Sequence, residues 1–246
     1  MRRKRAGARV EKSGAVCITG GVDVGETSIK SVLLVHSLVG EEVVAANVTL
    51  VRGSREPADL RTALRCSWAA VLAAAGVSDI DVAYVASTGT RDQVAFRVGH
   101  FLGRNCLGLG TRFRFPQAVG YVDWGARQLR CGIIDDDGQV VRRVSRRGQV
   151  DAASAAVTVA ALVGDQPPDS PLALIGGRTC DRAWQASFAS EVRRLRPTVR
   201  FLVADDAIFA AAYGAAVVAA RRYRRLSRRL VALHWVRPSE ASPWLN

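Results

Sequence analysis

Two apolar segments that each end in an Asp-x-Gly turn constrain the fold of this chain more than any other feature. They lie about a hundred residues apart, with Asp23 and Gly25 in the first turn and Asp123 and Gly125 in the second. A strand that ends in such a turn can bring a carboxylate and backbone N–H groups against a phosphate and its metal ion. Two such turns that face each other across a cleft can grip one nucleotide. An ordinary strand end with a glycine turn is the competing interpretation of each segment taken alone.

The elements predicted around the two turns follow the same order. A meander of three strands rich in β-branched residues precedes a helix and a further strand, and the order recurs in the second half, where two more helices and one more strand follow. Residues 92–102 are predicted to be either a helix or an extended loop. The predicted strands are 15–24, 29–36, 42–51, 83–87, 118–123, 130–135, 140–144, 172–175 and 199–203. The predicted helices are 57–76, 150–163, 182–195 and 206–230.

The chain has 246 residues, which is enough for one large domain or for two small lobes around a shared cleft. Since 49% of the residues are hydrophobic, a core can form. We predict an N-terminal lobe over residues 15–115, which contains the first turn, and a C-terminal lobe over 116–235, which contains the second. Residues 1–14 are predicted to be a basic tail, and residues 236–246 a second tail.

Composition excludes several classes of protein. The net charge of +13 comes almost entirely from arginine, which indicates a biased composition rather than a nucleic-acid surface. No apolar run is long enough to span a membrane, and none follows the basic N-terminus, so we expect a cytoplasmic protein. The five cysteines are odd in number and form no CxxC pair, which argues against a disulfide framework and a zinc site. His36 lacks a nucleophilic partner at a recognisable spacing and is expected to be a packed or edge residue.

The first turn carries the sharpest local pattern. Asp23 can hold a hydrated Mg²⁺ through its water shell, Gly25 lets the backbone approach a phosphate, and Lys30 can neutralise phosphate charge. A P-loop does not fit, because Glu26 stands where that motif needs its lysine and because a strand follows the turn instead of a helix. The candidate phosphate-binding residues of this segment are Gly21, Gly25, Thr27, Ser28 and Lys30.

Two further segments suit the adenosine part of a nucleotide. The apolar strand 172–175 ends on Gly176 and Gly177, and a turn without side chains can lie flat against a purine and a ribose. The small residues of 208–220 allow close helix packing beneath the nucleotide. An Ala-rich core helix is the alternative interpretation of that last segment.

In this order and spacing, the four segments resemble the superfamily of actin, hexokinase and heat-shock-protein ATPases. Residues 81–89 and 94–101 are similar to a stretch of the benzoyl-CoA reductase ATPase subunits, in which a strand ending in Thr-Thr-Gly precedes a Phe-x-x-Gly-His-Phe segment. Residues 116–138 are similar as well, and the resemblance includes the activators of 2-hydroxyacyl-CoA dehydratases. It implies an α/β, actin-like (ribonuclease H-like) ATPase fold, with two similar β-β-β-α-β-containing lobes around a nucleotide cleft.

The resemblance also implies a function. In this family, ATP binding and hydrolysis drive a conformational change that pushes an electron through a [4Fe-4S] cluster, shared between two subunits, into a partner reductase or dehydratase. ATP and Mg²⁺ are therefore the implied cofactors. The implied partners are a homologous ATPase subunit and a reductase or dehydratase subunit. By motif position, Asp23 and Asp123 are the candidate catalytic carboxylates, Gly125 belongs to the second phosphate loop, and Gly176 and Gly177 form the adenosine loop.

The sequence departs from the family in two respects. Residues 148–155 contain no cysteine where the family has one cluster ligand. The family's second ligand cysteine lies in a longer segment before the adenosine loop, and here residues 163–172 are too few to hold that segment. We therefore expect no [4Fe-4S] cluster bound in the family manner. Ala126 and Arg127 replace a Gly-Gln pair of the family's second phosphate motif. Nucleotide binding can therefore persist while ATP hydrolysis is slow or absent, because a side chain that positions water is lost. A non-catalytic scaffold and a small-molecule kinase of the same superfamily are the alternative functions.

Overall fold

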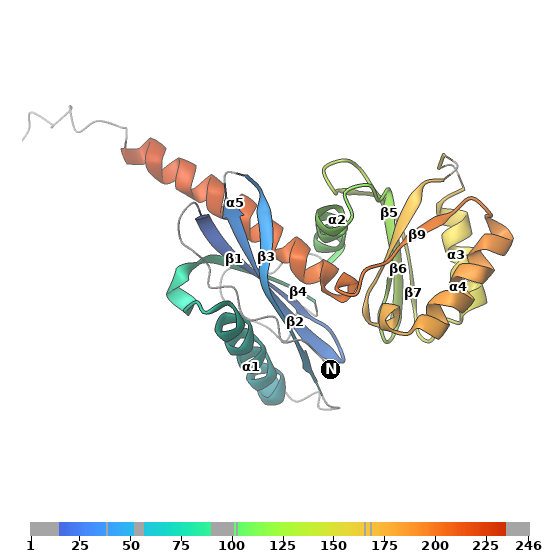
Figure 1. Ribbon diagram of the computed structural model, residues 1–246, viewed down its shortest axis with the longest axis horizontal. Coiled ribbons are helices and arrows are strands. Elements are labelled where there is room, and N and C mark those ends of the chain that lie inside the picture. Colours follow the sequence, from blue (N-terminus) through green and yellow to red (C-terminus); the bar gives the residue numbers. More distant parts are fainter. Residues whose placement is uncertain are drawn as a thin grey trace, which may run out of the picture.

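The computed structural model describes residues 15–37, 39–51, 57–89, 101, 103–164, 166–167 and 169–234. It contains two mixed β-sheets with their covering helices, and a long helix, α5 (Ala210–His234), that runs from the second sheet across the first (Figure 1). The predicted tails at 1–14 and 236–246 lie outside the described residues, as does the predicted helix or loop at 92–102 apart from Phe101.

The first sheet has the strand order β3-β2-β1-β4. Its first three strands form the predicted antiparallel meander, and β4 lies parallel to β1. Helix α1 packs Leu60, Leu64, Trp68 and Val71 against this sheet, because these residues recur at helical spacing and so share one face. The elements are β1 (Ala15–Val24), β2 (Ser28–Ser37), β3 (Glu41–Leu50), α1 (Pro57–Ala75), η1 (Asp79–Asp81) and β4 (Val82–Gly89).

The second sheet has the order β7-β6-β5-β8-β9 and repeats the meander. Helices α3 and α4 cover one of its faces, where Trp184 stacks on Phe188 and meets Trp124 edge to face. The predicted elements are confirmed with small shifts at their ends. They are β5 (Gly120–Trp124), β6 (Gln128–Ile134), β7 (Val140–Arg147), α3 (Ala152–Leu162), β8 (Pro171–Ile175), η2 (Gly177–Cys180), α4 (Arg182–Leu195), β9 (Arg200–Leu202) and η3 (Ala207–Phe209).

Helix α2 (Gly103–Arg114) is absent from the sequence-based prediction. Its backbone touches that of α5: a Cβ on Gly110 would lie 1.7 Å from the carbonyl oxygen of Ala210, and one on Gly214 would lie 1.7 Å from that of Cys106. Glycines lower the helix propensity of the α2 segment, so the local pattern does not indicate a helix, yet they are what allows the close crossing. Helix α2 contacts strands of both sheets, so its packing does not assign it to one lobe. The predicted lobe boundary after residue 115 therefore stays a prediction.

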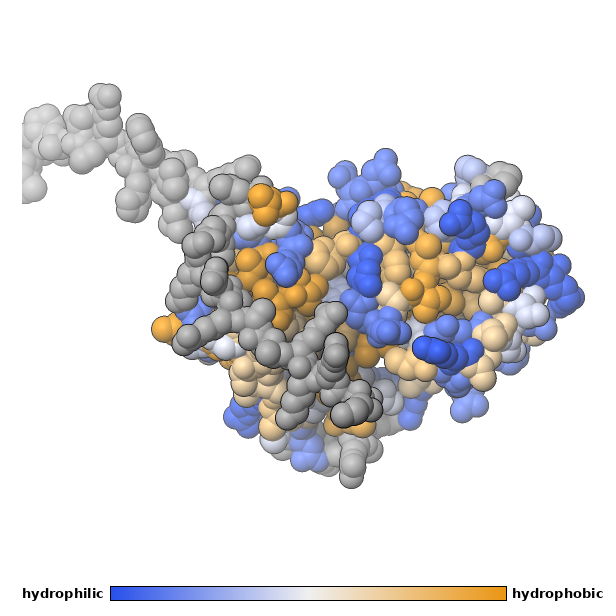
Figure 2. All heavy atoms as spheres, in the orientation of Figure 1, coloured by the Kyte–Doolittle hydropathy of each residue, from blue (hydrophilic) through white to orange (hydrophobic). Residues whose placement is uncertain are grey.

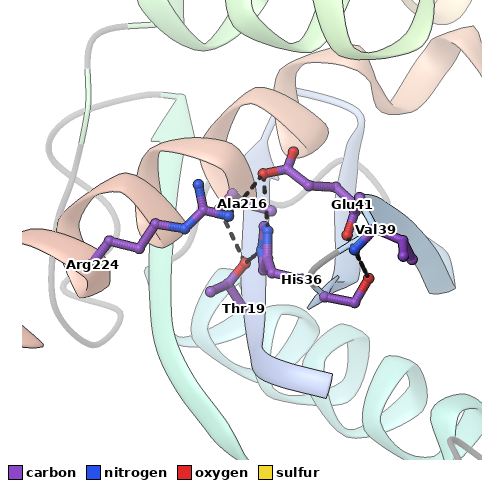
Figure 3. Close-up of polar contacts among 8 residues, drawn as sticks. Thr19, His36, Val39, Glu41, Ala216 and Arg224 are labelled. Atoms are coloured by element: carbon purple, nitrogen blue, oxygen red, sulfur yellow. Dashed lines mark hydrogen bonds and ion pairs between the residues drawn. The ribbon is translucent and has the colours of Figure 1, made fainter. Parts of the chain in front are cut away.

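A polar network that is buried at Thr19 and His36 and reaches solvent at Glu41 and Arg224 fixes α5 to the first sheet (Figure 3). The Thr19 hydroxyl of β1 donates to the carbonyl of Ala216 in α5 at 3.1 Å, and it lies 2.6 Å from Nε2 of His36 in β2. His36 Nδ1 lies 3.0 Å from Glu41 Oε1, and a guanidinium nitrogen of Arg224 in α5 lies 3.5 Å from the same oxygen. His36 is therefore a packed residue, as expected, and its network holds α5 over β1.

The surface carries much of the positive charge. Hydrophilic residues cover the end of the molecule formed by α3 and α4 (Figure 2), where Arg193 and Arg194 lie exposed in the last turn of α4.

All five cysteines are free thiols, of which Cys66 and Cys180 are exposed. In the described part of the chain, no helix combines the length and the apolar character that crossing a bilayer requires.

Candidate functional site

The two Asp-x-Gly turns and the diglycine turn line one cleft of about 360 Å³. Small-molecule sites commonly occupy about 300–1,000 Å³. Of the candidate residues named from the sequence, only Gly21 lies outside it. The others that line it are Asp23, Gly25, Thr27, Ser28, Lys30, Asp123, Gly125, Gly176 and Gly177. Segments that are far apart in the sequence thus converge on one space.

The β1–β2 hairpin presents Asp23 and Lys30 to the cleft as an ion pair. Its turn closes through a hydrogen bond of 3.0 Å that the Gly25 N–H donates to the Ser28 carbonyl, and Thr27 is exposed at the tip. Lys30 Nζ lies 3.1 Å from Asp23 Oδ2, and these side chains keep 12% and 14% of their surface exposed. A phosphate or a hydrated metal ion can therefore reach both charged groups from the cleft.

Gly21 lies beneath α5 and serves packing. A Cβ at this position would lie 1.9 Å from the carbonyl oxygen of Ala212 and 2.5 Å from the amide nitrogen of Ala216. No side chain fits there, because the α5 backbone rests directly on β1. The structure therefore supports a packing role for Gly21 instead of the predicted contact with a cofactor.

The β5–β6 hairpin repeats the charged arrangement with Asp123 and Arg130. Its turn closes through the Gly125 N–H, which donates to the Gln128 carbonyl at 2.9 Å. Arg130 Nε donates to Asp123 Oδ2 at 2.6 Å, and Nη2 of the same guanidinium contacts the same oxygen. Burial raises the pKa of the Asp123 carboxyl, while the charge of Arg130 opposes that rise. The guanidinium thus favours the ionised form of a carboxylate that the low-dielectric surroundings disfavour.

Arg130 is a charged cleft residue that the sequence motifs miss. The signal was nevertheless present, because Arg130 follows Asp123 by seven residues just as Lys30 follows Asp23. Both acid–base pairs are direct cross-strand partners in their hairpins. Cross-strand neighbours on one face of a sheet lie close enough for opposite charges to pair. Applying the register of the first hairpin to the second would have found Arg130.

The diglycine turn lies against the second hairpin. Gly176 has a φ of +94°, and a Cβ there would lie 2.5 Å from Asp123 Oδ1, so the position requires glycine. A Cβ on Gly177 would meet nothing within 4 Å, which means that this residue borders open space. Ile208 and Ala211 complete the apolar lining at this end of the cleft. The geometry suits a flat ring laid along the turn.

The donors in the cleft fit a nucleotide whose metal ion is held mainly by phosphate and water. In the described ranges, no group of three or more His, Cys, Asp or Glu side chains is arranged to hold a metal ion. Mg²⁺ usually keeps several of its waters and needs only one or two protein carboxylates besides phosphate oxygens. Asp23 is accessible enough for such a contact, whereas Asp123 is 5% exposed and bound to Arg130.

No family model matches the chain. A curated relative does: over 123 residues the sequence is 32% identical to one of the subunits of the benzoyl-CoA reductase of Thauera aromatica. The match covers 50% of this chain and 42% of that relative, so the chain spans less than half the length of the relative it matches.

Solved structures extend the comparison to most of the chain. Component A of the (R)-2-hydroxyglutaryl-CoA dehydratase of Acidaminococcus fermentans superposes with a TM-score of 0.68 at 16% identity, covering 85% of this chain and 99% of that one. The activator of the 2-hydroxyisocaproyl-CoA dehydratase of Clostridium difficile, with bound ADPNP, gives a TM-score of 0.68 at 17% identity and covers 86% and 97%. These likenesses confirm the predicted actin-like ATPase fold, an α/β fold with two mixed sheets. Together with the sequence match, they make the chain similar to a subunit of a benzoyl-CoA reductase over half of its length, and similar in fold to activators of 2-hydroxyacyl-CoA dehydratases over most of it.

Proposed function

We propose that this chain is a nucleotide-binding subunit of the ATPase type, which binds ATP with Mg²⁺ in the cleft between its two Asp-x-Gly hairpins. The observation that carries the proposal is the convergence of both hairpins and the diglycine turn on one cleft. A solved structure of similar fold contains the ATP analogue ADPNP, which supports the same ligand class here.

The residues divide the ligand among them. The Gly25 to Ser28 turn and Lys30 would hold phosphates, and Asp23 would meet Mg²⁺ through its water shell. Gly125 and Arg130 would contact the phosphates from the opposite side, with Asp123 keeping the guanidinium in position. Mg²⁺ would supply neutralisation of phosphate charge, and the chain would contribute orientation and fixed positive charge.

The adenosine end of the cleft would lie along Gly176 and Gly177. The open space beside Gly177 gives room for a purine ring, and Ile208 and Ala211 supply an apolar surface for one of its faces. This assignment explains why a positive-φ glycine follows β8 directly, since the turn must pass against Asp123 before it reaches the ring.

We further propose that the chain works with a homologous ATPase subunit and with a reductase or dehydratase subunit, and that it holds no [4Fe-4S] cluster of its own. The residues do not fit such a cluster, because its irons need thiolate ligands. Residues 148–155 contain no cysteine, and Asp151 there caps helix α3 by accepting from the Ser154 N–H at 2.7 Å. The exposed thiols Cys66 and Cys180 lie on elements that pack against different sheets.

Calorimetric titration with MgATP tests the central claim. The Asp23→Asn variant keeps the size of the side chain but removes its charge, so MgATP affinity should fall about tenfold or more, a loss of about 1.4 kcal/mol. Asp59→Asn is the matched control, since Asp59 is an exposed acid in the first turn of α1, and its affinity should equal that of the unaltered protein. Equal affinity of the Asp23 variant would contradict the assigned role.

The same preparation separates the alternatives. Phosphate release during incubation with MgATP would establish turnover. If no binding is detected up to about 1 mM ATP, which corresponds to very weak affinity, a non-catalytic scaffold that stabilises a partner is favoured. A phosphorylated small molecule among the products would point to a kinase.

A further inference from the structure

One ion pair joins the tips of the two hairpins. Arg127 Nε, in the β5–β6 turn, lies 3.3 Å from Glu26 Oε2, in the β1–β2 turn, and both residues line the cleft. The two turns belong to different sheets, so the pair crosses the mouth of the cleft. We call Glu26 and Arg127 the clasp.

An acid at this place conflicts with the ligand proposed for the cleft. A carboxylate in a phosphate-binding turn repels a phosphate, because like charges a few ångströms apart repel each other even in water. Arginine, in contrast, matches phosphate geometry and can donate two parallel hydrogen bonds to it. Without a nucleotide, Glu26 supplies the negative charge that Arg127 would otherwise find on a phosphate.

We infer that Arg127 is a phosphate-binding residue that Glu26 holds while the cleft is empty, and that it transfers to the terminal phosphates of a bound nucleoside triphosphate. The inference rests on the proposed nucleotide function. The clasp then acts as a competitor for the ligand, and it lowers the affinity that the cleft would otherwise have.

The exposure of the two side chains permits the transfer. Arg127 and Glu26 keep 64% and 54% of their side-chain surfaces exposed, and pairs of this kind are weak enough to exchange partners readily. The backbone of Arg127 is meanwhile fixed, because its carbonyl accepts a hydrogen bond of 2.9 Å from the Gly148 N–H. A swing of the side chain therefore suffices. Arg130, which is 37% exposed and bound twice to Asp123, is the stationary cation of the same hairpin.

Titration of four variants with MgATP and with AMP tests the clasp. Glu26→Gln should bind MgATP about fivefold more tightly, because the competing charge is gone. Arg127→Gln should bind it about tenfold more weakly, and Arg127→Lys should recover part of the loss. AMP affinity should change less than twofold in each of these variants, since AMP lacks the terminal phosphates. Glu191→Gln is the matched control: it removes a partly exposed acid 3.1 Å from Arg194 on α4, and it should change neither affinity.

The outcomes separate this inference from the proposal beneath it. If the unaltered protein binds MgATP and Arg127→Gln binds it equally well, the clasp is a surface ion pair only and the inference is overturned. Weaker MgATP binding by Glu26→Gln would overturn it too, because Glu26 would then be a ligand. If neither the unaltered protein nor any variant binds MgATP, the proposed function itself fails and the inference falls with it.

Discussion

The two hairpins of this protein share a backbone plan and differ in what lies behind them. In each, an acid in the first strand pairs with a base on the cross-strand neighbour, Asp23 with Lys30 and Asp123 with Arg130. The equivalent ladder positions just before these pairs are filled in opposite ways. Gly21 faces Val32 in the first hairpin, whereas Tyr121 faces Gly132 in the second.

The difference follows from the helix that crosses only the first hairpin. Helix α5 rests its backbone on β1, so the residue under it can have no side chain. On β5 the same position holds the buried Tyr121, and here the partner strand supplies the glycine: a Cβ on Gly132 would lie 2.8 Å from the Tyr121 ring. The same acid–base pair is therefore compatible with two kinds of packing. The first hairpin needs a glycine where the α5 backbone lies on it, and the second needs one where the Tyr121 ring lies on it.

The largest effect should come from breaking the support of the first hairpin. Gly21→Ala places a Cβ within 1.9 Å of a backbone oxygen of α5, which must shift together with the strand. We expect a loss of about 3 kcal/mol or more in the free energy of unfolding, at the upper end for overpacking. Urea unfolding followed by circular dichroism measures it.

Gly125→Ala is the matched control for this prediction. Its Cβ would lie 3.5 Å from the Gln128 carbonyl oxygen, an ordinary contact, so the expected change is below about 1 kcal/mol. Equal losses in the two variants would mean that α5 does not press on β1 as described.

The second effect compares the two bases. Arg130→Ala leaves Asp123 without its partner at 5% exposure, while Lys30→Ala leaves Asp23 at 14%. Removing one member of a buried pair costs about 3–5 kcal/mol, but Arg130 is itself 37% exposed, so we expect about 2 kcal/mol for Arg130→Ala. Lys30→Ala should cost about 1 kcal/mol, because water reaches Asp23 more easily.

A double-mutant cycle sharpens this second comparison. Asp123→Ala in the Arg130→Ala background should restore part of the lost stability, since no uncompensated carboxylate then remains. If Lys30→Ala and Arg130→Ala lower the free energy of unfolding equally, the burial of the paired acid does not distinguish the two hairpins.

Most of the fold follows from local pattern. The meanders, α1 and the strand before the diglycine turn were predictable, because β-branched runs and helical spacing specify them directly. Helix α2 was not predictable in this way, since Gly108 and Gly110 oppose helix formation locally and make sense only against Gly138 and Ala210 in the folded chain.

The site divides similarly. Asp23, Asp123 and Gly177 stand in recognisable turns, and the structure brings them to one cleft. The role of Gly21 could not be predicted from the first turn alone, because it depends on a helix nearly two hundred residues later in the chain. Arg130 was predictable only by comparing the hairpins with each other, which uses register rather than motif.

The smallest effect concerns the second turn of each meander, where an acid meets a helix arginine. Glu41 lies near Arg224, and the bond with His36 lowers the pKa of the Glu41 carboxyl. A lowered folded-state pKa contributes stability above about pH 4.5, the ordinary value for glutamate, and that contribution disappears as the pH falls through the folded value. Glu41→Gln should therefore lower the free energy of unfolding by under about 1 kcal/mol at pH 7, and stability should fall less steeply below about pH 4.5.

Asp136→Asn provides the comparison in the other meander. Asp136 lies in the β6–β7 turn, and its carboxylate is 3.6 Å from Arg112 on α2. The carboxylate is fully exposed, so solvent screens the pair. The variant's unfolding free energy at pH 7 should therefore equal that of the unaltered protein. If both variants lower the free energy of unfolding equally at pH 7, the network around His36 adds nothing beyond an exposed ion pair, and the first meander is no more firmly tied to its helix than the second.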